Sequence, residues 1–293
     1  MASAEKPTLL LTFDVEDWFQ VENFKTYIPY SLWDRFDLRV WKNTLRVLDI
    51  LDGFSFQPRA TFFILGWVAK RLPALVREIS NRGHEVASHG YGHTLCHEMN
   101  SVAFFEDLIS SKAMLEEITG QAVMGYRAPS FSINEKALKL VRDAGYLYDS
   151  SFNSFSSNSR YGSLDLSGLS KKSGVYQIAR NFLEIPISNL KFKNHILPLG
   201  GGGYFRLFPF QLFKQGIDAM LKKEKAFVFY AHPWEFDPNQ PRVHQASLGF
   251  KFRHYINLDR TQKKLDAMIT CFSNCPFKTL SAQANLVKDD SFS

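Results

Sequence analysis

The chain has 293 residues, of which 45% are hydrophobic, and this is enough for one large core or two modest ones. Its net charge of +6 comes from scattered residues, and no nucleic-acid motif accompanies them, so we expect no nucleic-acid partner. Three cysteines, Cys96, Cys271 and Cys275, argue against a disulfide framework and favour a reducing compartment. The first residues lack the features of a signal peptide, and no apolar stretch approaches the roughly 20 residues of a membrane span. We therefore expect a cytoplasmic protein.

Short apolar runs alternate with segments of helical spacing along most of the chain. The expected strands lie near 8–13, 60–65, 84–88, 122–127, 146–149, 182–187 and 226–231, and the expected helices near 72–83, 100–120, 132–145 and 208–225. Asn100 is a predicted N-cap and Gly120 a predicted helix stop, while Ser132 and Glu135 form a capping-box pattern. Strands that alternate with helices imply a parallel sheet, so we expect an α/β fold, a distorted (β/α)7-type barrel.

The second half of the chain is less regular. "NSFSSNSRYGS" (153–163) predicts an exposed loop, and four glycines in "LGGGGYFRLFP" (199–209) allow a sharp turn or a close approach of the backbone to a ligand. The tail after residue 235 starts rich in proline and becomes helical from about residue 258. We expect a barrel domain over 1–235 and a C-terminal extension over 236–293 that packs on it.

Ionisable residues follow five of the expected strands. They are Asp14, Glu16 and Asp17 after the first strand, His89 and His93 after the third, and Arg127, Asp149 and His232 after three later ones. In parallel α/β barrels the catalytic groups gather at the carboxyl ends of the strands. Helix-capping acids and surface histidines could explain any single member, but they explain the whole set poorly.

The two histidines in "SHGYGH" (88–93) are four residues apart, a spacing that lets His89 and His93 converge on one cation. One carboxylate would complete a site that lowers the pKa of bound water toward roughly 7. Asp14 and Glu16 share a strand face, so one could bind metal while the other acts as a base. A turn after Asp14 would instead bring Asp17 inward, and the sequence leaves this choice open.

Aromatic and basic residues near the same strand ends are candidate substrate contacts. Trp18 and Trp234 could stack on a substrate ring, although core packing explains most aromatic residues in a chain with 27 phenylalanines. Tyr204 and Arg206, which follow the glycines, are further candidates for substrate binding.

These motifs together resemble the polysaccharide deacetylases of the NodB-homology type, carbohydrate esterase family 4. The resemblance spans about 220 residues and rests on five motifs in family order, namely "TFDVED" (12–17), "SHGYGH" (88–93), "YRAPS" (126–130), "YDSS" (148–151) and "FVFYAHPWE" (227–235). The "DVED" motif and the C-terminal extension resemble a subgroup found near exopolysaccharide gene clusters. The resemblance implies an enzyme that removes N-acetyl groups from the amino sugars of a polysaccharide or its precursor.

The resemblance also implies a role for each site residue. His89, His93 and an acid, Glu16 or Asp17, would hold Zn²⁺ or another divalent ion such as Co²⁺, Mn²⁺ or Ni²⁺. Asp14 would take a proton from the attacking water, and Arg127 would orient Asp14. The remaining two roles fall at the leaving group. His232 would protonate the sugar amine, and Asp149 would help to keep that imidazole charged.

One departure from the family pattern concerns the metal. The second aspartate of the first family motif falls at Val15, which cannot bind a cation. Val15 supports one alternative, an inactive sugar-binding barrel. The resemblance to the "DVED" subgroup leaves a second alternative open, a related hydrolase of cyclic imides or ureides. The oligomeric state is not predicted.

Overall fold

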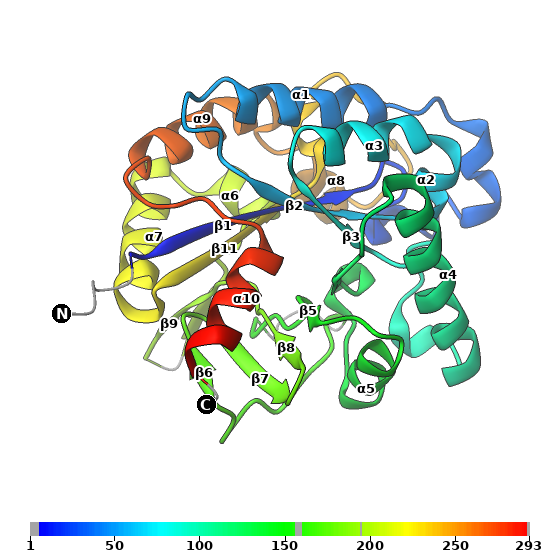
Figure 1. Ribbon diagram of the computed structural model, residues 1–293. Helices are drawn as coiled ribbons and strands as arrows, with labels where there is room; N and C mark the ends of the chain where they lie inside the picture. Colours follow the sequence, from blue (N-terminus) through cyan, green and yellow to red (C-terminus); the bar gives the residue numbers. More distant parts are fainter. Residues whose placement is uncertain (1–5, 156–159, 194, 292–293) are drawn as a thin grey trace.

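A nine-stranded sheet forms the centre of the computed structural model, which describes residues 6–155, 160–193 and 195–291 (Figure 1). The strand order is β11-β1-β2-β3-β4-β5-β8-β7-β6. The strands are β1 (Thr8–Val15), β2 (Ala60–Ile64), β3 (Glu85–Ser88), β4 (Gly125–Tyr126), β5 (Tyr148–Asp149), β6 (Lys171–Lys172), β7 (Val175–Ala179), β8 (Phe182–Glu184) and β11 (Ala226–Ala231). The first seven in this order pair in parallel, and they are the seven strands expected from the sequence.

The sheet curls into a nearly closed barrel, as predicted. The segment after β8 returns to β11, where the Val228 amide donates to Ser188 Oγ at 2.9 Å. β6 and β7 join the far edge in antiparallel pairs, and β9 (Leu190–Phe192) pairs with β10 (His195–Leu197) in a separate hairpin. The predicted loop at 153–163 includes residues 156–159, which lie outside the described residues.

Helices surround the barrel (Figure 1). They are α1 (Val40–Asp52), α2 (Gly66–Arg71), α3 (Pro73–Asn81), α4 (Ser101–Thr119), α5 (Glu135–Asp143), α6 (Gly202–Leu207), α7 (Phe210–Glu224), α8 (Leu248–Tyr255), α9 (Thr261–Cys271) and α10 (Leu280–Ser291). The α4 ends agree with the sequence, since Asn100 caps it and Gly120 adopts a left-handed φ of 66°. The predicted capping box of α5 is wrong, because its N-cap is Asn134, whose side chain accepts from the Ala137 amide.

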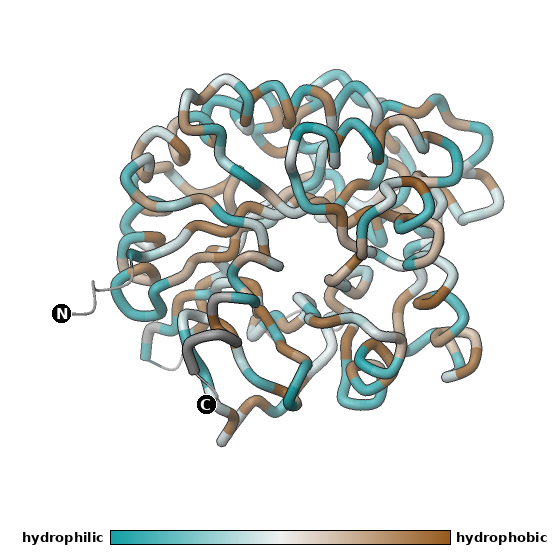
Figure 2. The backbone as a smooth tube through the Cα atoms, viewed as in Figure 1, coloured by the Kyte–Doolittle hydropathy of each residue, from teal (hydrophilic) through white to brown (hydrophobic). Residues whose placement is uncertain are grey.

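Hydrophobic residues run along the strands and the inner helix faces, shown in brown in Figure 2, while hydrophilic residues gather on the outer turns. The residues of β1 are all buried, as expected for a parallel strand that is covered on both faces. Of the glycines at 200–203, Gly201 and Gly202 approach Tyr230 of β11, and Gly202 and Gly203 line a cavity at the carboxyl end of the barrel. A side chain at Gly201 would collide with the Tyr230 carbonyl.

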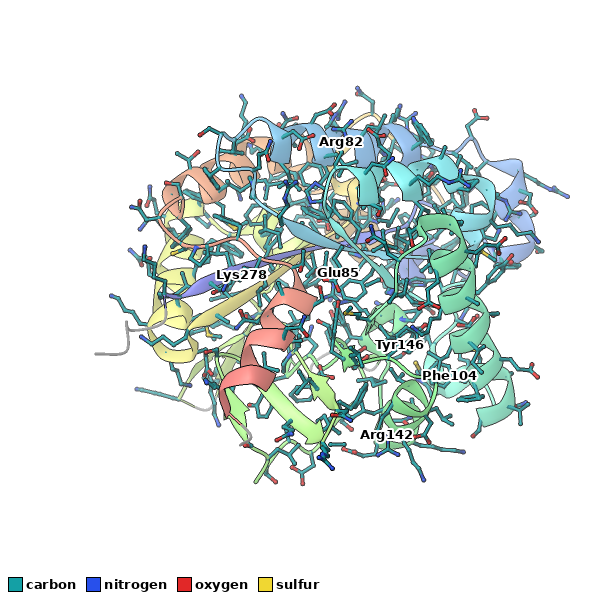
Figure 3. The ribbon with its side chains drawn as sticks, in the orientation of Figure 1. Arg82, Glu85, Phe104, Arg142, Tyr146 and Lys278 are labelled. Carbon is teal, nitrogen blue, oxygen red and sulfur yellow. The ribbon has the colours of Figure 1, made fainter. Side chains whose placement is uncertain are left out.

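The C-terminal helix α10 covers the amino-terminal end of the barrel. The Leu280 amide donates to Thr61 Oγ1, and the Ser281 amide donates to a carboxylate oxygen of Glu85, which is labelled in Figure 3. Leu280 and Val287 are buried in a core cluster with strand residues. α8 lies at the opposite end, behind the barrel in Figure 1. No helix among the described residues is long and apolar enough to cross a membrane.

Candidate active site

The polar side chains that follow the strands meet at the carboxyl end of the barrel. Asp14 lies near the end of β1, and Glu16 follows that strand. Val15 packs into the hydrophobic core between them, so the alternation along the chain directs both carboxylates to the same side. Both acids line a cavity of 430 Å³ together with His89, His93 and His232.

The loop after β3 carries the two histidines in a tight turn rather than a helix. Gly90 and His93 both have positive φ, 69° and 55°. Asp107 on α4 holds this turn, because its carboxylate accepts from the Tyr91 amide at 3.1 Å. The sequence analysis missed Asp107, which lies inside a helix with no motif around it.

Glu16, His89 and His93 form a buried group that could hold a metal ion. Their ligand atoms all lie within 4.8 Å of one another. Nδ1 of His89 donates to the Arg127 carbonyl at 2.7 Å, which leaves Nε2 as the ring atom that could bind a cation. Burial lowers the pKa of His89 to about 4 and that of His93 well below its usual value, so both imidazoles are neutral, the form that binds metal.

The carboxylate of Glu16 fits a cation on independent grounds. Its Oε2 is buried with no hydrogen-bond partner among the described residues, although it lies 3.1 Å from Nε2 of His93. Burial raises the pKa of Glu16 to about 7, since the acid lies in a dry site and Asp14 and Glu235 are close. A buried acid beside neutral imidazoles would be stabilised in its charged form by a divalent ion.

Asp17 lies outside this group. Its Oδ1 accepts from the Trp18 amide, and its Oδ2 accepts from the amides of Arg39 and Val40 at 2.6 and 2.8 Å. These contacts place the carboxylate at the start of α1, where it satisfies amides that the helix itself leaves unpaired. Of the two acids that the sequence left open, the structure brings only Glu16 next to the histidines.

Arg127 is fully buried and holds Asp14. Its Nη1 donates to Asp14 Oδ1 at 2.7 Å and to Thr12 Oγ1 at 2.8 Å, while Nε donates to the Ser150 carbonyl. Burial alone would raise the pKa of Asp14, but Arg127, His89 and His232 outweigh it and hold that pKa below the usual value. Asp14 is therefore ionised, with Oδ2 free to face the cavity.

Glu235, and not Asp149, supports His232. Oε1 of Glu235 accepts from His232 Nδ1 at 2.8 Å and from the His232 amide at 3.0 Å. Nε2 of His232 is therefore directed toward Asp14 Oδ2, at 4.0 Å, and Glu16 Oε1, at 3.2 Å. Burial alone would lower the pKa of His232, but Glu16, Glu235 and Asp14 raise it to about 9.

Asp149 was predicted to keep the His232 imidazole charged, and this is wrong because Glu235 makes that contact. The Asp149 carboxylate accepts from the hydroxyl and amide of Ser151, and the backbone of Asp149 lies opposite Glu184 on β8. Burial raises the pKa of both Asp149 and Glu184. One of the two carboxyl groups then keeps its proton and donates it in a hydrogen bond to the other. This pair lies inside the sheet.

Arg206 also differs from its prediction as a sugar contact. Its side chain is 1% exposed, and Nε donates to Glu235 Oε2 at 2.6 Å. The remaining nitrogens donate to the carbonyls of Arg253, His254 and Ile256 around the end of α8. Because these donors are engaged inside the protein, Arg206 anchors Glu235 rather than substrate.

Of the aromatic residues predicted to contact substrate, Trp234 and Tyr204 line the cavity and Trp18 is packed in the core. Trp234 lies in the cavity wall between the rings of His232 and His254, at 5.1 and 4.1 Å, and its Nε1 lies 3.4 Å from Glu16 Oε1. Tyr204 also lines the cavity. Trp18 does not fit its predicted role, because its ring is 3% exposed and packs edge-on against Phe19 and Phe36.

Comparison with known protein families gives two adjoining matches. Residues 2–148 match the family model described as polysaccharide deacetylase, which is half of the chain. The chain belongs to the polysaccharide deacetylase family. Residues 150–283 match a domain of unknown function, DUF3473. The border falls at β5, so both parts of this deacetylase-family chain contribute strands to one sheet.

Known relatives of this deacetylase-family chain include a peptidoglycan-N-acetylglucosamine deacetylase of Bacillus cereus. It is 29% identical over 103 residues, which cover 35% of this chain and 47% of the relative. The chain spans less than half of the length of the curated relatives that it matches.

Two solved structures share the fold over nearly the whole chain. One is a protein assigned to the polysaccharide deacetylases from Mycobacterium smegmatis, with a TM-score of 0.64 and 21% identity, covering 100% of this chain and 94% of that one. The other is Puue allantoinase, with a TM-score of 0.63 and 13% identity, covering 99% and 94%. At these identities the likeness concerns the fold alone.

Proposed function

We propose that this chain is a metal-dependent hydrolase that removes N-acetyl groups from the amino sugars of a polysaccharide or its precursor. The observation that carries the proposal is the convergence of Glu16, His89 and His93 opposite Asp14 and His232, in one cavity of a chain of the deacetylase family. A binding module would not need a metal-ligand set, an ionised carboxylate and an imidazole in the same place.

Glu16, His89 and His93 would hold the divalent ion, and Zn²⁺ suits two imidazoles and a carboxylate. A bound ion supplies Lewis-acid chemistry, which activates water and polarises an acyl oxygen. This role matters because an acetamide carbonyl is a weak electrophile. The cavity of 430 Å³ that surrounds these residues is of the size that small-molecule sites usually have.

The protein's own residues would then move two protons. Asp14 Oδ2 accepts the proton of the attacking water, because Arg127 occupies Oδ1 and keeps the group ionised. Nε2 of His232 donates a proton to the sugar nitrogen, since Glu235 holds Nδ1. An amine leaves only when it is protonated, so an acid separate from Asp14 is required. The products are acetate and a free amino sugar.

The test is acetate release from N-acetylglucosamine oligomers by the purified protein, before and after metal chelation. We expect release that stops with chelator and returns with added Zn²⁺ or another divalent ion. His232→Ala should keep its metal and slow turnover by roughly 10² to 10⁴. Matched assays follow the opening of hydantoin-like rings and the binding of sugar. Ring opening without acetate release, or sugar binding without hydrolysis or metal, would contradict the proposal.

A further inference from the structure

Large apolar side chains are exposed around the mouth of the active-site cavity. On α8, Leu248 is 82% exposed and Phe252 is 55% exposed, and their spacing of four residues places them on one face of the helix. Leu207 at the end of α6 is 41% exposed, and it lines the cavity together with Phe252 and Gly249. Single exposed apolar residues are ordinary, but a group of them at a functional opening marks a binding surface.

The charged residues on α8 and in the segment just before it are positive, whereas the acid Glu22 lines the same cavity. The sequence has no aspartate or glutamate from residue 238 to residue 258, and the same segment carries Arg242, Lys251 and Arg253. Two of these cations are held beside α8. The guanidinium of Arg242 lies 4.2 Å from the Tyr255 ring centroid, and Nζ of Lys251 donates to the His244 carbonyl at 3.2 Å.

We propose that this surface, formed by Leu207, Leu248, Phe252 and the cations Arg242, Lys251 and Arg253, docks on an anionic lipid bilayer. Apolar side chains flanked by lysine and arginine enter the headgroup region, and each cation near an anionic leaflet strengthens binding by about fivefold. The apolar area is small, so docking needs the anionic lipid and is reversible. A second copy of this chain fits worse, because a two-fold contact would place the same cations against each other.

Docking would turn the cavity toward the membrane. Leu207, Gly249 and Phe252 line the opening, so the active site would face the headgroup layer when α8 is bound. A glycan that is attached to a lipid or lies at the membrane surface would then reach the site directly. This consequence rests on the proposed function, whereas docking itself rests on the surface alone.

The test is co-sedimentation of the full chain with vesicles. We expect binding to vesicles that contain phosphatidylglycerol, little binding to pure phosphatidylcholine, and release at high salt, because salt screens exposed charges. Leu248→Ser and Lys251→Glu should each weaken binding several-fold to about tenfold, since each removes one of the few groups that reach the bilayer. Val102→Ser is the matched control, because Val102 is 69% exposed on α4, one helical turn before Glu106. It should bind as the unchanged protein does.

Three results would overturn the docking proposal. The first is failure of the unchanged protein to bind anionic vesicles, and the second is an equal loss in Val102→Ser. The third is a dimer, detected by light scattering, that Leu248→Ser dissociates while vesicles remain unbound. Leu248→Ser should still release acetate from soluble oligomers. Vesicle binding by a protein that releases no acetate from any glycan would contradict the proposed function and leave docking intact.

Discussion

Glu235 accepts a hydrogen bond from Nδ1 of His232 at 2.8 Å, and the two residues lie at the ends of a single turn of 3-10 helix. Pro233 starts this turn, which brings Glu235 back to the side chain of the histidine that follows β11. Arg206 holds the other carboxylate oxygen. The orientation of the proposed acid is thus set by a short segment next to it in the sequence and by an arginine that α8 anchors.

This relationship predicts the effect of Glu235→Gln. An amide cannot stabilise the imidazolium as a carboxylate does, so kcat should fall by roughly 10- to 100-fold, less than the loss of the acid itself. KM should change by no more than about twofold, because Glu235 is buried beneath His232. Metal content should stay the same. Steady-state kinetics with acetylated oligosaccharides would measure these changes.

Asp149→Asn is the control for that substitution. Asp149 contacts Ser151 and Glu184 rather than His232. Its substitution should therefore lower the free energy of unfolding and leave kcat nearly unchanged. If Asp149→Asn lowers kcat as much as Glu235→Gln does, the assignment of Glu235 is wrong.

A second prediction concerns acid stability and His84, which is far from the candidate metal group. Burial lowers the pKa of His84 to about 4, and its Nδ1 accepts from the Ala60 amide. The folded protein thus resists protonation there, whereas the unfolded chain takes up a proton near pH 6.5. Stability from this residue is therefore lost as the pH falls from about 6.5 to 4, by roughly 3 kcal/mol in total.

His84→Asn would keep an acceptor for the Ala60 amide and remove the titration. The free energy of unfolding, measured by denaturant titration between pH 7 and pH 4.5, should fall less steeply in the variant, by up to about 1.4 kcal/mol per pH unit. Parallel curves for the two proteins would show that His84 does not take part in acid unfolding.

A third prediction concerns how much the packing of α10 on the barrel contributes to stability. Leu280 is fully buried among strand residues, so Leu280→Ala should destabilise the protein by about 2 to 5 kcal/mol. The exposed Leu212 on α7 is a matched site, and Leu212→Ala should stay within about 0.5 kcal/mol of the unchanged protein. Equal, small effects in both variants would mean that the C-terminal helix is a loose appendage. Thermal or denaturant unfolding gives the comparison.

The sequence was a good guide where local rules decide the outcome. The carboxyl ends of parallel strands share one edge, so Asp14, His89, Arg127 and His232 could be expected to meet once the strands were recognised. Asn100 and Gly120 show the same for helix ends, because capping depends on neighbouring residues.

It was a poor guide where a contact depends on packing between distant segments. Arg206 looked like a sugar contact because it follows flexible glycines, but the carbonyls at the end of α8 engage it instead. Trp18 looked accessible, yet its ring is enclosed by Phe19 and Phe36. Glu235 could have been found, since "HPWE" places an acid three residues after a strand-ending histidine.

Metal content per chain tests the central claim most directly, namely that Glu16, His89 and His93 hold one divalent ion. The purified protein and its Glu16→Ala, His89→Ala and Asp17→Ala variants would be analysed after dialysis against a metal-free buffer. We expect one ion per chain in the unchanged protein and in Asp17→Ala, which loses at least ~1 to 3 kcal/mol of stability because the amides of Trp18, Arg39 and Val40 lose their acceptor. We expect none in Glu16→Ala or His89→Ala. An ion retained by Glu16→Ala and lost by Asp17→Ala, or no ion in the unchanged protein, would contradict the account.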